Sequence, residues 1–174
     1  MKKYTSTKQR IRTLTQHSLF LAIGIILNIV ESIIPIPIAI PGVKLGLANT
    51  IGLIVLYFYS PKEYIYIGFL RVLIVGFRNF LSFGFFLSLS GWFLSSIVAV
   101  LIYKTKQFSI YGLSISSAVF HGIGQMIIVM FFYNAYGLIL YLPVLMLTGI
   151  ITGTLTSFAS SLVLSKLNKH IAHL

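Results

Sequence analysis

The chain has 174 residues, of which 57% are hydrophobic and 9% are charged, and its mean hydropathy is +0.98. Soluble domains carry roughly 25% charged residues, so this composition excludes a water-soluble globular domain and favours a chain embedded in lipid. The formal net charge is +11, with 13 Lys and Arg against two acids, Glu31 and Glu63, and there is no cysteine. Disulfides, iron–sulfur clusters and thiolate chemistry are therefore excluded.

Apolar segments separated by charged or helix-breaking residues predict six transmembrane helices. In chain order they cover residues 16–33, 45–59, 64–77, 81–103, 111–133 and 138–164. A spanning helix needs about 20 apolar residues, so the second and third spans are short, and five spans or a re-entrant pair remain alternatives. The expected fold is an all-α membrane protein. Its transmembrane domain covers residues 16–165, between a basic segment at 1–15 and a basic tail at 166–174.

Most basic residues fall on one side of such a six-span bundle. This side receives Lys2, Lys3, Lys8, Arg10, Arg12, Lys62, Lys104, Lys106, Lys166 and Lys169. The opposite side receives Lys44 and Arg78, and Arg71 lies within the third span. The positive-inside rule then predicts a multi-pass protein of the cell membrane with both termini in the cytoplasm. Topology and lipid headgroups account for the positive charge, and no basic stripe with interleaved aromatics predicts nucleic-acid binding.

Pairs of small residues four apart occur on three of the predicted spans. They are Ser18 and Ala22, Ser114 and Ala118, and Gly149 and Gly153. Such pairs let helix backbones approach closely. Packing inside the bundle is the ordinary explanation, and docking of another membrane subunit is the alternative.

Polar side chains within the predicted spans converge on the outer half of the bilayer. The candidate substrate-binding residues are Glu31, Lys44, Asn49, Arg71, His121 and Gln125. A charge in hydrocarbon costs roughly 2.5–3.5 kcal/mol on insertion scales, so such residues are retained when they are paired, hydrated or functional. Together they predict a pocket open to the outside. The cations Lys44, Arg71 and Arg78 outnumber Glu31, which favours an anionic or phosphate-bearing ligand.

Each of these residues also has a structural explanation. Glu31 is an ion-pair partner for Arg71 or Arg78 without any ligand. Lys44 and Arg78 can extend to the lipid headgroups. His121 can serve as a hydrogen-bonded contact between helices.

The sequence lacks the motifs of common catalytic and metal sites. It contains no phosphate-binding GxxxxGK[ST] loop and no CxxC or HExxH spacing. Prenyl transfer normally needs clustered carboxylates that hold magnesium against a diphosphate. Glu31 and Glu63 fall on opposite sides of the predicted bundle. We therefore expect no catalytic residues, no metal and no cofactor.

Several segments resemble the Gx transporter family, which is often labelled heptaprenyl diphosphate synthase component I. They are Glu31-Ser-Ile-Ile-Pro-Ile-Pro, Pro41-Gly-Val-Lys-Leu-Gly-Leu-Ala-Asn49, Arg71-Val-Leu, Ser88-Leu-Ser-Gly91 and Ala118-Val-Phe-His121-Gly-Ile-Gly-Gln125. The resemblance covers residues 14–165. Gly122 departs from the pattern, because the family is expected to carry Asn after the His, and this puts a ligand role for that turn in doubt.

That family is in turn similar to the substrate-binding S-components of energy-coupling factor (ECF) transporters. The resemblance implies a six-helix bundle with cytoplasmic termini and a ligand site in its outer half. It implies that the loop at 34–44 acts as a lid. It also implies that Ser18 and Ala22 dock onto an ECF-type transmembrane subunit driven by separate ATPases.

Three functions are consistent with the sequence. The preferred one is a non-catalytic membrane subunit for uptake of a small anionic or isoprenoid- or quinone-related solute. The alternative is a membrane accessory subunit of a heptaprenyl diphosphate synthase in isoprenoid or menaquinone biosynthesis. The third is a structural membrane subunit without a ligand.

Overall fold

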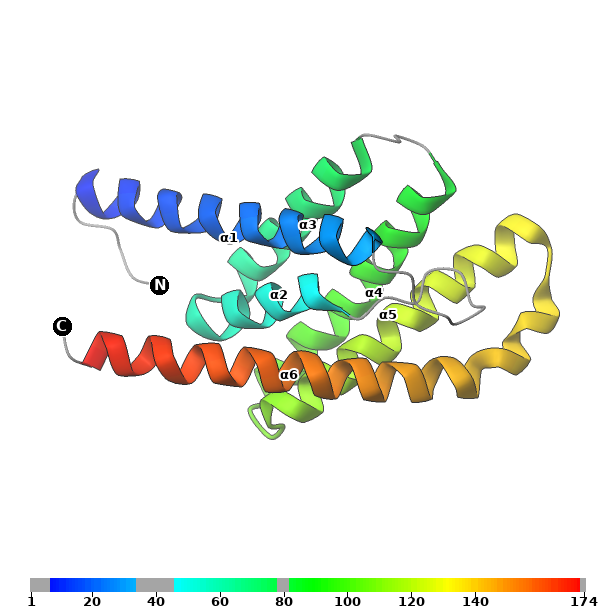
Figure 1. The fold of residues 1–174 in the computed structure, drawn as a ribbon. Coiled ribbons are helices and arrows are strands. Elements are labelled where there is room, and N and C mark those ends of the chain that lie inside the picture. The colour runs from blue at the N-terminus through cyan, green and yellow to red at the C-terminus, as the bar shows by residue number, and fades with distance from the viewer. Residues whose placement is uncertain (1–6, 34–45, 78–81, 173–174) are drawn as a thin grey trace.

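The regular structure that the computed structural model describes is entirely helical. It describes residues 7–33, 46–77 and 82–172. These ranges contain α1 (Thr7–Ile33), α2 (Leu47–Phe58), α3 (Pro61–Phe77), α4 (Phe83–Thr105), α5 (Ile110–Tyr133), the short 3₁₀ helix η1 (Tyr136–Tyr141) and α6 (Leu142–Ala172) (Figure 1). The predicted all-α fold is confirmed over this part of the chain.

The helices occupy the predicted segments, but the two terminal helices are longer than the predicted spans. α1 begins at Thr7 and α6 continues to Ala172, so both extend into the basic terminal segments. Lys and Arg are good helix formers, so a helix continues through residues that mark the edge of the lipid. The start of the last predicted span forms η1 before α6 begins.

Local signals set several helix ends. The hydroxyls of Ser82 and Ser109 cap α4 and α5, each accepting a hydrogen bond of 3.3 Å from the backbone N–H three residues later. α4 and α5 end at Lys106 and Asn134, which adopt left-handed φ angles of 56° and 49°. α3 begins at Pro61. Proline is favourable there, because the N–H of the first helical residue has no partner within the helix.

Within the described residues, four helical stretches are long and apolar enough to cross a membrane. They are α1, α4, α5 and the stretch Tyr136–Leu167, whereas α2 is a shorter apolar helix. Their outward side chains are large and apolar, as at Phe131, Leu147 and Ile151, of which 61–71% is exposed. Lipid accounts for such a surface. The chain is therefore a membrane protein, and passage of α2 and α3 through the bilayer stays a prediction.

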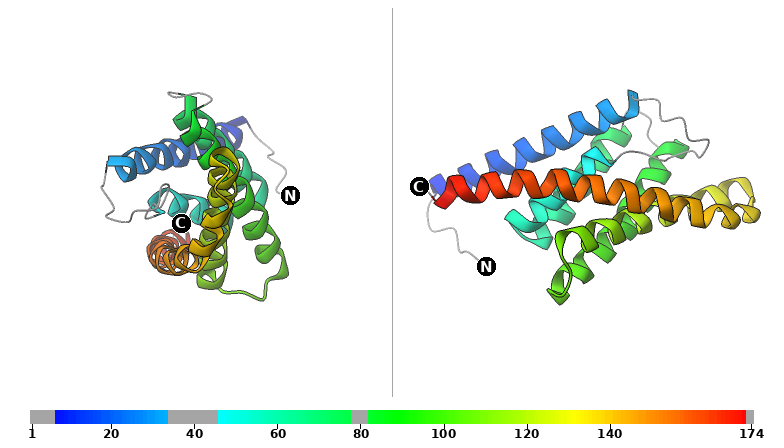
Figure 2. Two further views of the ribbon diagram at one scale, coloured as in Figure 1. Left: turned by 90° about the vertical axis from the view of Figure 1, so that its right-hand side faces the viewer. Right: turned by 60° about the horizontal axis from the view of Figure 1, so that its bottom comes forward.

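The short helix α2 lies at the centre of the bundle. It packs against α1, α3 and α6, and the views show α1 and α6 on opposite sides of it (Figures 1 and 2). Ile54, Val55 and Leu56 of α2 are at most 2% exposed. A helix of 12 residues is only about 18 Å long. Because its neighbours cover it, α2 does not have to match the thickness of the hydrocarbon.

The start of α1 and the end of α6 lie at the same end of the bundle, and the α2–α3 and α4–α5 connections lie toward this end (Figures 1 and 2). These segments carry Lys8, Arg10, Arg12, Lys62, Lys104, Lys106 and Lys166. We call this end the basic end. Among side chains that the structure describes, Arg71 is the one Lys or Arg placed elsewhere. This arrangement fits an even number of membrane crossings.

Small residues bring α5 and α6 into close contact. A Cβ added to Gly153 would lie 2.6 Å from the Cα of Ile115, and one added to Gly149 would lie 2.9 Å from the Cα of Val119. The Ser114 hydroxyl also donates a 2.8 Å hydrogen bond to the carbonyl of Gly153. The small pairs on these two helices therefore serve packing inside the bundle.

Gly153→Ala should destabilise the bundle, because the added methyl would collide with the backbone of α5. We expect the free energy of unfolding to fall by about 1–3 kcal/mol, measured as a lower thermal midpoint in detergent. Gly137→Ala is the matched control, since a Cβ there would meet nothing within 4 Å. Equal midpoints for the two variants would contradict the close α5–α6 packing.

Candidate functional site

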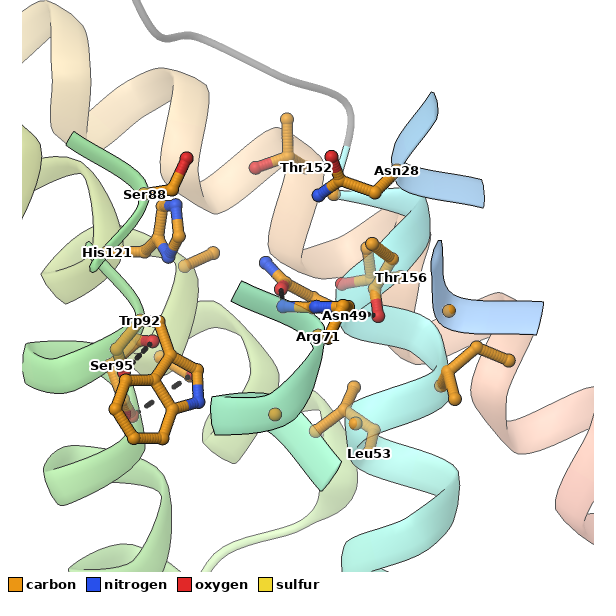
Figure 3. Close-up of a pocket in the computed structure, with 18 of the residues that line it drawn as sticks. Asn28, Asn49, Leu53, Arg71, Ser88, Trp92, Ser95, His121, Thr152 and Thr156 are labelled. Carbon is orange, nitrogen blue, oxygen red and sulfur yellow. Dashed lines mark hydrogen bonds between the residues drawn. The ribbon is translucent and has the colours of Figure 1, made fainter. Parts of the chain in front are cut away.

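A cavity of about 100 Å³ with both polar and apolar groups in its wall lies among the six α-helices, and Figure 3 shows part of this wall. Its lining comes from the second half of α1 and the first half of α6, so it is displaced from the basic end. The polar side chains around it are Asn28, Glu31, Asn49, Tyr64, Arg71, Ser88, Trp92, Ser95, Ser114, Ser117, His121, Gln125, Thr148, Thr152 and Thr156.

The helix α2 begins at this cavity, inside the bundle. Its N-cap residue, Gly46, has a left-handed φ of 82°, and no side chain caps the helix from that position. The backbone N–H of Gly46 donates a hydrogen bond to Oε1 of Glu31, which is 3% exposed. Glu31, near the end of α1, therefore ties α1 to the first turn of α2.

Arg71 of α3 reaches the same turn of α2. Its guanidinium donates hydrogen bonds to the carbonyl of Ala48 and, at 3.3 Å, to Oδ1 of Asn49. Gly24 of α1 leaves space for this side chain, since a Cβ there would lie 3.4 Å from Cδ of Arg71. Arg71 is 9% exposed, and its Nε has no hydrogen-bond partner in the part of the chain that the structure describes.

A direct ion pair between Glu31 and Arg71 is not formed, and Arg78, the alternative partner, lies outside the described residues. Both residues are described and line the cavity, yet neither an ion pair nor a hydrogen bond joins them. The carboxylate binds a backbone amide, and the guanidinium binds two uncharged oxygens. The charge of Arg71 therefore has no direct counterion among the described residues.

His121 and Gln125 of α5 also line the cavity. Gly91 of α4 leaves space for the imidazole, because a Cβ there would lie 2.8 Å from the His121 ring. Gln125 is 8% exposed, and no hydrogen bond joins its side chain to another described residue. Its amide can therefore bond to a molecule in the cavity, as donor or as acceptor.

The structure brings together five of the six predicted site residues. These are Glu31, Asn49, Arg71, His121 and Gln125. Lys44, Arg78 and the predicted lid at 34–44 lie outside the described residues. The predicted surplus of positive charge depended on Lys44 and Arg78. The described lining has one acid and one Arg.

Several lining residues were not predicted. Asn28, Trp92 and a series of hydroxyls belong to the wall (Figure 3). A signal for the hydroxyls was present, because Thr148, Thr152 and Thr156 recur every four residues and so share one face of a helix. The hydroxyls of Ser114 and Thr156 share a 2.8 Å hydrogen bond across α5 and α6.

The described residues contain no cluster of His, Asp or Glu that could hold a metal ion. The fold and the cavity define a class, that of helical membrane proteins with a buried polar site. A family model described as heptaprenyl diphosphate synthase component I matches residues 20–163, and the chain belongs to this family. It is thus a non-catalytic component, as predicted. No curated protein and no solved structure matches it, and the likeness to ECF S-components stays a prediction.

Gly46→Ala should disturb the start of α2 for two reasons. The left-handed backbone costs a residue with a Cβ about 1–2 kcal/mol, and the added Cβ would lie 3.0 Å from Cγ2 of Thr156. We expect a lower thermal midpoint, and adding Thr156→Ser, which removes only that methyl, should restore part of the loss. Gly84→Ala is the control, because its nearest neighbour would be 3.8 Å away. An unchanged midpoint for Gly46→Ala would contradict this geometry.

Proposed function

We propose that this protein is the membrane-embedded, non-catalytic component of a heptaprenyl diphosphate synthase, and that its cavity binds a small anionic or isoprenoid-related compound. The family match is the observation that carries this proposal. It runs from residue 20 to residue 163, and every residue that lines the cavity falls inside it, from Phe20 to Thr156. The cavity therefore belongs to the part of the chain that defines the family.

The distribution of acids supports a separate catalytic chain. Prenyl transfer requires carboxylates that hold magnesium against a diphosphate. Glu31 accepts the N–H of Gly46 at the cavity, whereas Glu63, in the first turn of α3, accepts a hydrogen bond from Ser60 toward the basic end. The two carboxylates do not share a site. A partner subunit with clustered carboxylates would supply the chemistry.

We place the basic end in the cytoplasm, according to the positive-inside rule. A soluble synthase subunit would meet the protein there. The cavity would then lie in the outer half of the cell membrane, within a six-span bundle. A polar cavity in an apolar bundle suits a compound with a polar head and an apolar body.

A second candidate function is solute uptake, for which one surface provides support. Ser18 and Ala22 are exposed on α1 and lie on a stripe of exposed residues. The other members of this stripe are Ile11, Thr15, Ile26, Ile29 and Ile33. A face with small residues at its centre suits close approach of another membrane helix. In this case the partners would be an ECF-type transmembrane subunit and its ATPases.

Copurification from native membranes in mild detergent separates the two functions. We expect a soluble, carboxylate-rich prenyltransferase to copurify with the tagged protein and to form more product in its presence. Recovery of ATPases with a large transmembrane protein instead would contradict the synthase role and support uptake. Ala22→Trp is the diagnostic variant, because it should release a partner docked on α1 and leave a soluble synthase subunit bound.

A further inference from the structure

The N-terminus of α2 lies at the cavity, and the described residues do not satisfy all of its N–H groups. No side chain caps it at Gly46, and Ala48, in its first turn, is 3% exposed. The N–H of Asn49 and of Thr50 bond to the Gly46 carbonyl, at 2.8 and 3.3 Å. The N–H groups of Leu47 and Ala48 have no such bond to a described residue. Unbonded N–H groups and the helix dipole make a helix N-terminus a binding place for an anion.

Two side chains of the cavity wall independently indicate a ligand. Arg71 brings a positive charge to the first turn of α2, is 9% exposed, and has only uncharged acceptors there. A buried cation that no carboxylate contacts directly is unfavourable in a bundle surrounded by lipid. Gln125 is 8% exposed, lines the same cavity and makes no side-chain hydrogen bond to a described residue. A ligand that carries an anionic group for Arg71 and a second hydrogen-bonding group for Gln125 would satisfy both side chains.

Glu31 provides the only carboxylate in the described wall. It accepts the N–H of Gly46, so its negative charge already lies at the positive end of α2. It attracts Arg71 electrostatically but forms no direct ion pair with it, so the guanidinium can still bind an anion. An incoming anion would gain from Arg71 and from the α2 amides, but it would be repelled by Glu31.

We propose that the cavity binds its ligand through one anionic group, a carboxylate or a phosphate, held between Arg71 and the first turn of α2. Glu31 is a specificity-determining residue whose negative charge weakens anion binding. This inference rests on the proposed role of the cavity as a binding site. It assigns the class of ligand. It also assigns opposite effects on anion affinity to the two charged residues, since Arg71 strengthens binding and Glu31 weakens it.

The chain provides its own reporter for this binding. It contains one tryptophan, Trp92, and this residue lines the cavity (Figure 3). Ligand binding should therefore change the intrinsic tryptophan emission of the purified protein. Nanodiscs of an uncharged lipid such as phosphatidylcholine remove competing anionic headgroups.

Three probes share one branched five-carbon tail and differ in the head. They are 3-methylbutanoate, 3-methylbutyl phosphate and 3-methylbutanol. We expect a saturable change in Trp92 emission with one or both anions and none with the alcohol. The anion that binds more tightly identifies the head group as carboxylate or phosphate.

The charge variants test the assignment of each residue. Arg71→Gln should weaken anion binding by about tenfold or more, because it removes a charged donor. Glu31→Gln should tighten it by about threefold to tenfold, because it removes the repulsion and keeps an oxygen that accepts the N–H of Gly46. Lys104→Gln is the matched control, since it removes a positive charge at the basic end and should leave the affinity unchanged.

The proposal is overturned if neither anion gives a saturable change, or if Glu31→Gln binds more weakly than or equally to the wild type. It is also overturned if folded Arg71→Gln keeps the wild-type affinity. If Arg71→Gln does not fold, the direction of the Glu31→Gln effect decides. The assay contains no synthase subunit, so anion binding without copurification of that subunit would refute the proposed function alone.

Discussion

A helix that begins inside a lipid-embedded bundle must have its backbone polar groups satisfied by the protein or by a ligand, because hydrocarbon offers no hydrogen bonds. In this chain α2 imposes that constraint. Its start at Gly46 is surrounded by α1, α3 and α6, and two charged side chains converge on it. Glu31 binds an amide at the N-cap, and Arg71 binds a carbonyl and an amide oxygen of the first turn.

The rest of the bundle supports this centre. Glycines on α1, α4 and α6 leave room for Arg71, for His121 and for the close packing of α5 on α6. Serine and threonine hydroxyls of α5 and α6 bond to one another and to backbone carbonyls, as Ser114 does with Gly153. The polar interior is thus separated from lipid by apolar outer faces. Such an interior can bind a small ligand.

The sequence predicts the helices well, because long apolar segments have few other structures available to them in lipid. It also predicts that Glu31, Asn49, Arg71, His121 and Gln125 converge, since polar residues in such segments must find one another. The partner of each charge could not be predicted. Glu31 and Arg71 bond to the backbone at the start of α2 and not to each other. These bonds depend on where α2 begins, which the sequence pattern does not specify. The hydroxyl wall of α6 was visible as a four-residue repeat from Thr148, but single hydroxyls are common in membrane helices.

The most direct test of a hydrated polar centre at the start of α2 is the reactivity of introduced cysteines, since the chain has none of its own. A small, water-soluble thiol reagent should label Asn49→Cys in the intact membrane. It should not label Val55→Cys, at a position with 0% exposure, or Ile151→Cys on the apolar outer face of α6. If Asn49→Cys proved as inert as Val55→Cys in folded protein, no solvent-accessible cavity would exist at this helix end, and the account would be contradicted.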